Sequence, residues 1–203
     1  MTEIPDRRAS AGFSMIEVLI TLVILMFGLL GISGLQARAQ QAEFESYQRA
    51  QALVLLNDMA DRINRNRETT PCYDITTSSG TPYLGSSATA TAACSGYGSA
   101  ATQRLAINDL TEWNNLLTGT AEVSGGNNIG AMTGARGCVT RDPATNSYAI
   151  AVAWQGIAET SAPAALAGAT TATSNAISCG ANLYGSETRR RVVWTTLRIA
   201  KLK

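Results

Sequence analysis

The sequence predicts an α+β protein in which one long N-terminal helix packs on a small antiparallel sheet. Three observations carry this prediction. Residues 13–35 are almost entirely apolar, and residues 36–67 contain neither proline nor glycine. The C-terminal half holds segments in which bulky and small side chains alternate, the period of a β-strand. With 203 residues, the chain has room for one globular domain and an anchor.

The chain starts with a short polar leader, residues 1–12, that carries Arg7 and Arg8 close to the apolar segment. A helix over residues 13–35 would be ~34 Å long, enough to cross a hydrocarbon core. The two arginines predict a cytoplasmic N-terminus and a C-terminal part outside the inner membrane. A secretory signal would show a small-residue cleavage site after the apolar run, and residues 33–37 are a poor version of one. A plain membrane anchor is the other alternative, and neither explains Glu17.

Glu17 is a carboxylate four residues inside the apolar segment, where an unpaired charge costs on the order of a few kcal/mol. Gly12 and Phe13 precede it and a run of apolar residues follows. This order of leader, glycine, phenylalanine, glutamate and apolar span resembles the class III signal of type IV prepilins. The resemblance implies that a prepilin peptidase cuts after Gly12 and methylates the new amine of Phe13. It also implies that Glu17 pairs with the amine of a neighbouring subunit during assembly.

Residues 36–67 are expected to continue the same helix on the periplasmic side, because most of them are good helix formers. Leu56, Met59, Ala60 and Ile63 follow the spacing of one apolar face. Residues 53–56 are apolar nearly all round and are expected to be covered on several sides. Four charged residues are expected to lie largely off the apolar face: Asp58, Asp61, Arg62 and Arg65. The glycines of the apolar half either weaken the helix locally or allow close helix contact: Gly28, Gly31 and Gly34.

Residues 68–203 are expected to form the globular domain. Its elements are read from turn residues, helix caps and period-two alternation. They are a loop with one short strand at 71–103, a short helix that starts at Asn108 and ends near Gly119, strands at 136–141, 148–155 and 191–199, and a second loop at 158–178. The strand at 148–155 should have one bulky and one small face.

The four cysteines lie beyond the apolar segment and form no C-x-x-C pair. An even, spread-out set of this kind suggests two disulfides in an oxidising compartment, with buried free thiols as the alternative. Of the three possible connectivities we expect Cys72–Cys94 and Cys138–Cys179. This choice closes the first loop locally and ties two later elements across the second loop.

Composition argues against an enzyme, a metal site or a cofactor site. The chain has no histidine, which removes the commonest general base and zinc ligand. The formal net charge of +1 gives no support for nucleic-acid binding. Carboxylates outside the helix are scattered singly: Asp74, Asp109, Glu112, Glu122, Asp142, Glu159 and Glu187. The arginines at 189–191 are interpreted as a solvated strand edge, and Trp113, Trp154 and Trp194 as core or interface residues.

Five stretches of the C-terminal half resemble PilV-type minor pilins. They are Asn108–Leu110 with Trp113–Asn114, Gly134–Cys138, Val152–Gly156 and the arginine-led final strand. The resemblance implies the pilin fold and a structural role: a minor pilin of the tip or initiation complex that primes pilus assembly. The implied partners are other minor pilins, the major pilin, the prepilin peptidase, the inner-membrane assembly platform and a tip adhesin. A type II secretion pseudopilin and a DNA-uptake or adhesive pilin are the alternative functions.

Overall fold

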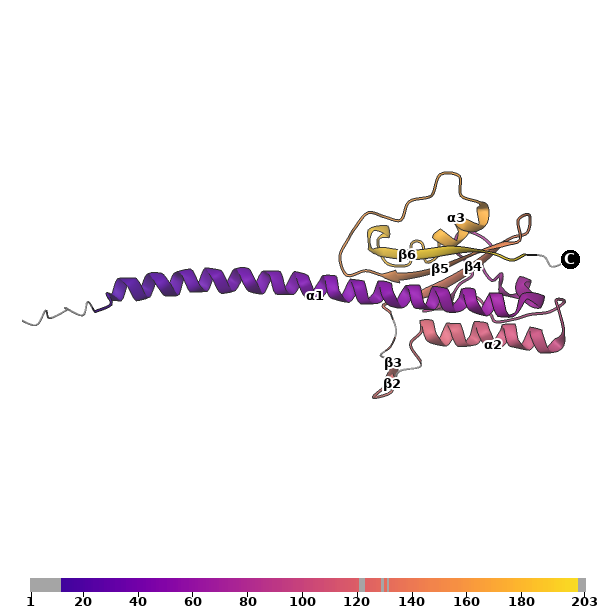
Figure 1. The fold of residues 1–203 in the computed structure, drawn as a ribbon, viewed down its shortest axis with the longest axis horizontal. Helices are drawn as coiled ribbons and strands as arrows, with labels where there is room; N and C mark the ends of the chain where they lie inside the picture. Colours follow the sequence, from indigo (N-terminus) through magenta and orange to yellow (C-terminus); the bar gives the residue numbers. More distant parts are fainter. Residues whose placement is uncertain (1–11, 121–122, 129, 131, 201–203) are drawn as a thin grey trace, which may run out of the picture. The chain divides into compact units, whose positions relative to one another are not determined.

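The computed structural model describes residues 12–120, 123–128, 130 and 132–200 (Figure 1). The chain divides into two compact units, residues 1–44 and 45–203. The expected leader lies, up to residue 11, outside the described residues. The α+β prediction is confirmed, because a long N-terminal helix packs through its second half on a small antiparallel sheet.

Helix α1 spans Met15–Arg65 as a single element of 51 residues. It continues unbroken through Gly28, Gly31 and Gly34, so the glycines do not interrupt it. A 3₁₀ segment, Arg67–Tyr73, follows and contains Pro71. The chain leaves the α-helical path at Asn66 (φ −108°, ψ 56°), and Thr69 within the 3₁₀ segment is also non-helical (φ −121°, ψ 25°).

The main sheet has four antiparallel strands in the order β1-β4-β5-β6. Their bounds are β1 Leu84–Gly85, β4 Arg136–Asp142, β5 Ser147–Gln155 and β6 Arg190–Arg198. The three longer strands agree with the sequence prediction to within a residue at each end. A second, two-stranded sheet, β2 Val123–Ser124 with β3 Asn127–Asn128, was not predicted. Gly125 and Gly126 form its turn, both with positive φ.

Both faces of the central strand β5 are buried. Its bulky side chains, Tyr148, Ile150, Val152 and Trp154, belong to the larger core cluster together with side chains of α1 and α2. Its alanines, 149, 151 and 153, belong to a second cluster with side chains of α3. The predicted division into a bulky and a small face is therefore confirmed, and each face has its own covering element.

Helix α2 spans Ala100–Leu117, so the prediction that it starts at Asn108 is wrong. The cap is Ser99: its hydroxyl accepts from the N–H of Thr102, and the Thr102 hydroxyl accepts from the N–H of Ser99. This reciprocal pair is a capping box with threonine in place of the usual Glu or Gln. Figure 1 shows α2 beside the second half of α1.

Residues 158–178 are not entirely a loop, which corrects a second prediction. Helix α3 spans Thr171–Ile177, and the hydroxyl of Thr170 caps its first turn by accepting from Thr173 N. The buried side chains of Ala172 and Ala176 pack against the alanine face of β5. The helix fits there because both surfaces consist of small side chains.

The apolar helical turn at residues 53–56 is buried by the rest of the chain on one side only. The expectation that other parts of the chain bury it on several sides is therefore wrong. Leu55 and Leu56 are buried in the core. Leu53 and Val54 are 43% and 66% exposed. The second half of α1 therefore presents apolar surface that its own domain does not cover.

Candidate functional site

The N-terminal end of α1 holds the predicted processing and assembly residues. Gly12, Phe13 and Ser14 precede the helix without regular structure. The carbonyl of Ser14 accepts from the N–H groups of Glu17 (3.0 Å) and Val18 (3.3 Å), which starts the helix. Glu17 therefore lies in the first helical turn, where a negative charge is favoured by the helix dipole. Phe13 is 84% exposed, so its backbone lies open ahead of the helix.

The first half of α1 is compatible with a hydrocarbon environment. An 18-residue window has a mean hydropathy of 2.6 and none of it is buried within the chain; by length and composition this helix could cross a membrane. Its two hydroxyl groups are satisfied inside the helix: Thr21 donates to the carbonyl of Val18 and Ser33 to that of Leu30, both at 2.9 Å. Glu17 is then the one ionisable side chain in residues 13–35.

Arg62 joins the second half of α1 to α2. It is buried among the residues of the core-facing side, although it was expected to lie off the apolar face. Its Nε donates to Asp58 (2.7 Å), and its Nη1 donates to Asp109 (3.0 Å) and Glu112 (2.7 Å). Burial disfavours the charge, but the bonds to the carboxylates outweigh it and raise the pKa of Arg62. The structure thus brings together carboxylates that the sequence shows as separate.

A second layer of hydrogen bonds extends from this ion cluster. The hydroxyl of Tyr73 donates to Asp109 at 2.5 Å, and Asn66 donates to Tyr73 (3.2 Å) and to the carbonyl of Thr102 (2.9 Å). Burial and the neighbouring Asp109 raise the pKa of Tyr73, so it stays protonated and a donor. This hydrogen-bond network connects the end of α1, the 3₁₀ segment and α2 to one another.

The arginines at the start of β6 are anchors and not a solvated edge, which corrects a further prediction. Arg190 is buried; it pairs with Glu187 at 2.7 Å and donates to the carbonyls of Ile177 (2.7 Å) and Cys179 (3.3 Å). It therefore holds the end of α3 against the sheet. Only Arg189 keeps a largely exposed side chain, 46%, paired loosely with Glu159.

Replacing Glu187 by Gln should lower the stability of the domain in a pH-dependent way. Partial burial opposes the charge of Glu187, but the bonds from Arg190 and from Asn182 N lower its pKa below the ordinary glutamate value. The stabilisation that Glu187 gives the folded domain is therefore fully present at pH values above the ordinary pKa of glutamate. It is lost as the pH falls through the lowered pKa that Glu187 has in the folded protein. We expect Glu187→Gln to cost about 1 kcal/mol at pH 7. Thermal melts at neutral and at strongly acidic pH should show the difference from wild type shrinking in acid; a constant difference would contradict this.

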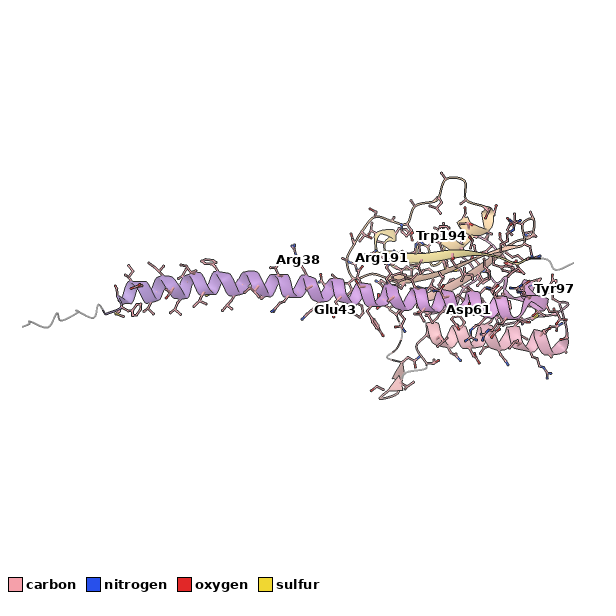
Figure 2. All side chains as sticks on the ribbon, in the orientation of Figure 1. Arg38, Glu43, Asp61, Tyr97, Arg191 and Trp194 are labelled. Carbon is pink, nitrogen blue, oxygen red and sulfur yellow. A yellow bond between two sulfur atoms is a disulfide. The ribbon has the colours of Figure 1, made fainter. Side chains whose placement is uncertain are left out.

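Arg191 and Glu45 connect β6 with α1 on the other side of the sheet. Arg191 lies 3.4 Å from Glu45 and donates to the carbonyls of Thr188 (2.9 Å) and Ala158 (2.6 Å). Glu45 also accepts from the N–H groups of Ile157 (3.0 Å) and Ala158 (3.1 Å). Figure 2 labels Arg191 and Trp194 on this strand, and Trp194 is 38% exposed, whereas Trp113 and Trp154 are buried.

The structure joins Cys72 to Cys94 and Cys138 to Cys179, the pairs expected from the sequence. The first closes the loop between the 3₁₀ segment and α2. The second ties β4 to the segment after α3. In the chain-entropy account each loop of this size contributes ~3 kcal/mol through the unfolded state.

A metal-dependent chemistry finds no support in the described part of the chain, where no three His, Cys, Asp or Glu side chains gather in a metal-binding arrangement. The acidic groups that do meet are neutralised in part by Arg62 and serve to hold α1 against α2. Residues 12–44 offer an apolar helix with a single acidic group, Glu17, at its start. Residues 45–200 form a folded head in which ion pairs hold the second half of α1.

Comparison with known families gives two matches. Residues 7–33 match the prokaryotic N-terminal methylation motif, and residues 34–111 match the family model described as type IV pilin Tt1218. The first covers Gly12, Phe13 and Glu17; the second covers the rest of α1 and, of the Arg62 cluster, Arg62, Asp58 and Asp109. No curated protein and no solved structure matches the chain significantly.

Proposed function

We propose that this chain, which is a type IV pilin-like protein with a class III prepilin signal, is a minor subunit of the pilus tip or initiation complex and primes pilus assembly. Pilins are structural proteins, and the membrane-anchoring helix and the folded head agree with that class. The narrower assignment to a minor pilin is supported by the resemblance of the C-terminal half to PilV-type proteins.

One observation carries the proposal most strongly: Glu17 is the lone carboxylate in the apolar half of α1, one turn after Gly12 and Phe13. Cutting after Gly12 would create a positive amine on Phe13, about one helical turn before this carboxylate. An ion pair in a low dielectric is favoured far more than one in water. Pairing of Glu17 with the amine of a neighbouring subunit would therefore select the correct axial position.

The proposal implies a defined route and defined partners. The prepilin peptidase removes residues 1–12, and the subunit waits in the inner membrane with its head in the periplasm. It then joins other minor pilins and the major pilin on the assembly platform, with a tip adhesin as a further partner. An oxidising periplasm suits the two disulfides of the head.

Deletion of the gene tests the pilus assignment. We expect loss of surface pili, counted by electron microscopy of sheared preparations, while secreted enzymes still reach the medium. Expression of the intact chain from a plasmid should restore the pili. The opposite result, normal piliation with exoproteins retained in the cell, would identify a type II secretion pseudopilin, which shares the prepilin signal.

A further inference from the structure

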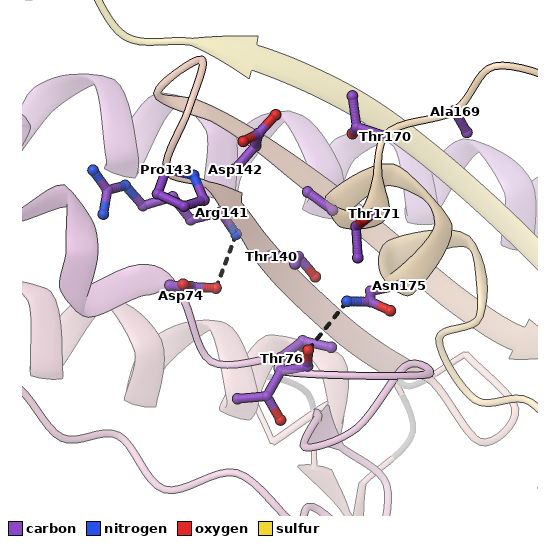
Figure 3. A pocket seen from close by; sticks show the side chains of 12 residues that line it. Asp74, Thr76, Thr140, Arg141, Asp142, Pro143, Ala169, Thr170, Thr171 and Asn175 are labelled. Carbon is purple, nitrogen blue, oxygen red and sulfur yellow. Dashed lines mark hydrogen bonds between the residues drawn. The ribbon is translucent and has the colours of Figure 1, made fainter.

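The main sheet has two edges, and the chain itself covers the one formed by β4. Strand β1 pairs with the start of β4. Further along, the hydroxyl of Thr76 accepts from Val139 N (3.2 Å), and Thr76 N donates to Val139 O (2.9 Å). Arg141 N donates to Asp74 Oδ1 (2.8 Å), a contact that Figure 3 marks with a dashed line. Residues 74–85 thus supply partners along the outer edge of β4.

Strand β6 forms the opposite edge, and alternate residues of this strand direct their backbone groups away from the sheet. Ile199 N donates to Asn146 O (3.2 Å), and Arg189 O accepts from Gly156 N (2.8 Å), so the odd-numbered residues of β6 face β5. The even-numbered residues from 192 to 198 therefore point their N–H and C=O groups outward. Among the described residues of the chain, these outward groups have no hydrogen-bond partner.

The edge of β6 lacks the features by which proteins usually prevent a free strand from pairing. Residues 192–197 read VVWTTL, without proline or charge, and the register with β5 continues over nine pairs without a bulge. The side chains of Trp194, Thr196 and Arg198 are exposed, so solvent reaches this part of the strand. A long, regular and uncharged edge of this kind is suited to the addition of a further strand.

A second copy of the chain does not fit this edge while both copies are anchored in one membrane. Strand β6 runs in the same direction as the second half of α1, starting with Arg191 beside Glu45 (Figure 1). Antiparallel pairing of two copies would place their residue-45 ends on opposite sides, about 30 Å apart. The apolar segment precedes residue 45 in each copy, so the two anchors could not enter the same bilayer. Parallel pairing requires outward residues that alternate between the strands, which two identical edges related by a two-fold axis cannot provide.

The charge along the edge is uneven. At the start of β6, Arg190 and Arg191 are already paired with Glu187 and Glu45. At the end of β6, Arg198 is exposed and has no ion pair with the described residues, and two lysines follow at 201 and 203 in the sequence. An incoming strand therefore gains most from acidic side chains at the end that lies beside Arg198.

We infer that an extended, proline-free segment of another protein, acidic at one end, adds to β6 as a fifth strand of the main sheet. A partner that is not anchored through a pilin helix is free to pair antiparallel, with its acidic N-terminal end beside Arg198. Antiparallel pairing is the slightly more stable mode. The inference uses the membrane anchor and not the assignment as a minor pilin, so it can fail without affecting that assignment.

The test uses the full-length protein in detergent, with the peptide acetyl-EEVTTIVV-amide as the probe. In an antiparallel alignment its second glutamate lies opposite Arg198 and its isoleucine opposite Trp194. Amide hydrogen exchange, followed by NMR, should be fast at Trp194 and Thr196 in the free protein and slow at Val193 and Thr195. Peptide at about ten times its dissociation constant should slow the exchange of the outward amides about tenfold and leave the inward ones unchanged.

Thr196→Pro removes one outward N–H and no bond to β5, a place where an edge strand tolerates proline. The domain should fold, and peptide binding should weaken about tenfold. Arg198→Glu should weaken binding of this peptide about threefold and favour acetyl-KKVTTIVV-amide instead. Arg104→Glu is the matched control, because Arg104 is an exposed arginine on α2, and it should bind both peptides as wild type does.

The peptide acetyl-EEVPTIVV-amide, which lacks an N–H needed for the ladder, should bind at least about tenfold more weakly than the probe. The inference is overturned if the probe leaves the exchange of the outward amides unchanged, or if the proline peptide binds as well as the probe. It is also overturned if the folded Thr196→Pro protein keeps wild-type affinity. Protection of the same amides that rises with protein concentration, without any peptide, would assign the edge to a second copy and contradict the inference.

Discussion

A Glu17→Val protein should be cleaved, inserted in the membrane and folded, yet nearly absent from pili. Valine is tolerated by lipid better than a carboxylate, so insertion should not suffer. The amine of the neighbouring subunit would lose its partner in a low-dielectric environment. Losing one such contact should reduce incorporation roughly tenfold to a hundredfold.

The measurement compares mutant protein in the membrane fraction with mutant protein in sheared fibres, beside wild type. Glu43→Gln is the matched control, because Glu43 is an exposed carboxylate on the same helix beyond the apolar half. Figure 2 shows where it lies on α1. The control should enter pili normally. If Glu17→Val enters pili at the wild-type level, the pairing role is wrong, and recognition by the peptidase becomes the better explanation for the carboxylate.

Arg62→Met should be the most destabilising substitution on the second half of α1. It removes the one positive charge that Asp58, Asp109 and Glu112 share, and Asp109 is buried. Breaking a buried ion pair from one side costs about 3–5 kcal/mol because the remaining charge stays unpaired. If the free energy of unfolding falls by about 3 kcal/mol, the melting temperature of a domain of this size should fall by roughly 6–12 °C.

Near-UV circular dichroism of the intact protein in detergent would follow this transition, since Trp113 is fully buried beside α1 and donates to the carbonyl of Leu55 (2.9 Å). Arg65→Met, an exposed arginine one turn later, should change stability by no more than about 0.5 kcal/mol. Removing both charges in Arg62→Met/Asp109→Leu should cost less than the sum of the single changes. Equal melting temperatures for Arg62→Met and wild type would show that the cluster does not hold α1.

Helices and strands are predictable from the sequence where a helical or period-two pattern continues over many residues. Helix α1 shows an uninterrupted run of helix formers, and β5 shows strict alternation over its length. Helix α3 has seven residues, TATSNAI, most of them weak helix formers. Its stability comes from packing on the alanine face of β5, which local propensity does not report.

Buried charges were the other feature that sequence reasoning missed. Arg62 pairs with Asp109 across 47 positions of the chain, so the local sequence does not reveal this partner. The signal that was available is spacing: Leu55, Met59, Arg62 and Ile63 share one helical face. Arg190 pairs with Glu187, which is close in sequence. Its other partners, the carbonyls of Ile177 and Cys179, come close to it only when the chain folds. The start of α2 was missed because its capping box uses Thr102 and not a glutamate.

The mass of the mature N-terminus tests the central claim most directly. We propose that the prepilin peptidase cuts after Gly12 and leaves α1 in place as the anchor. Mass spectrometry of the protein from purified membranes or pili should find a chain that begins at Phe13 with one added methyl group on its amine. A mature chain that begins near Gln36 would show that the apolar half of α1 is removed as a conventional signal peptide, and would contradict the account.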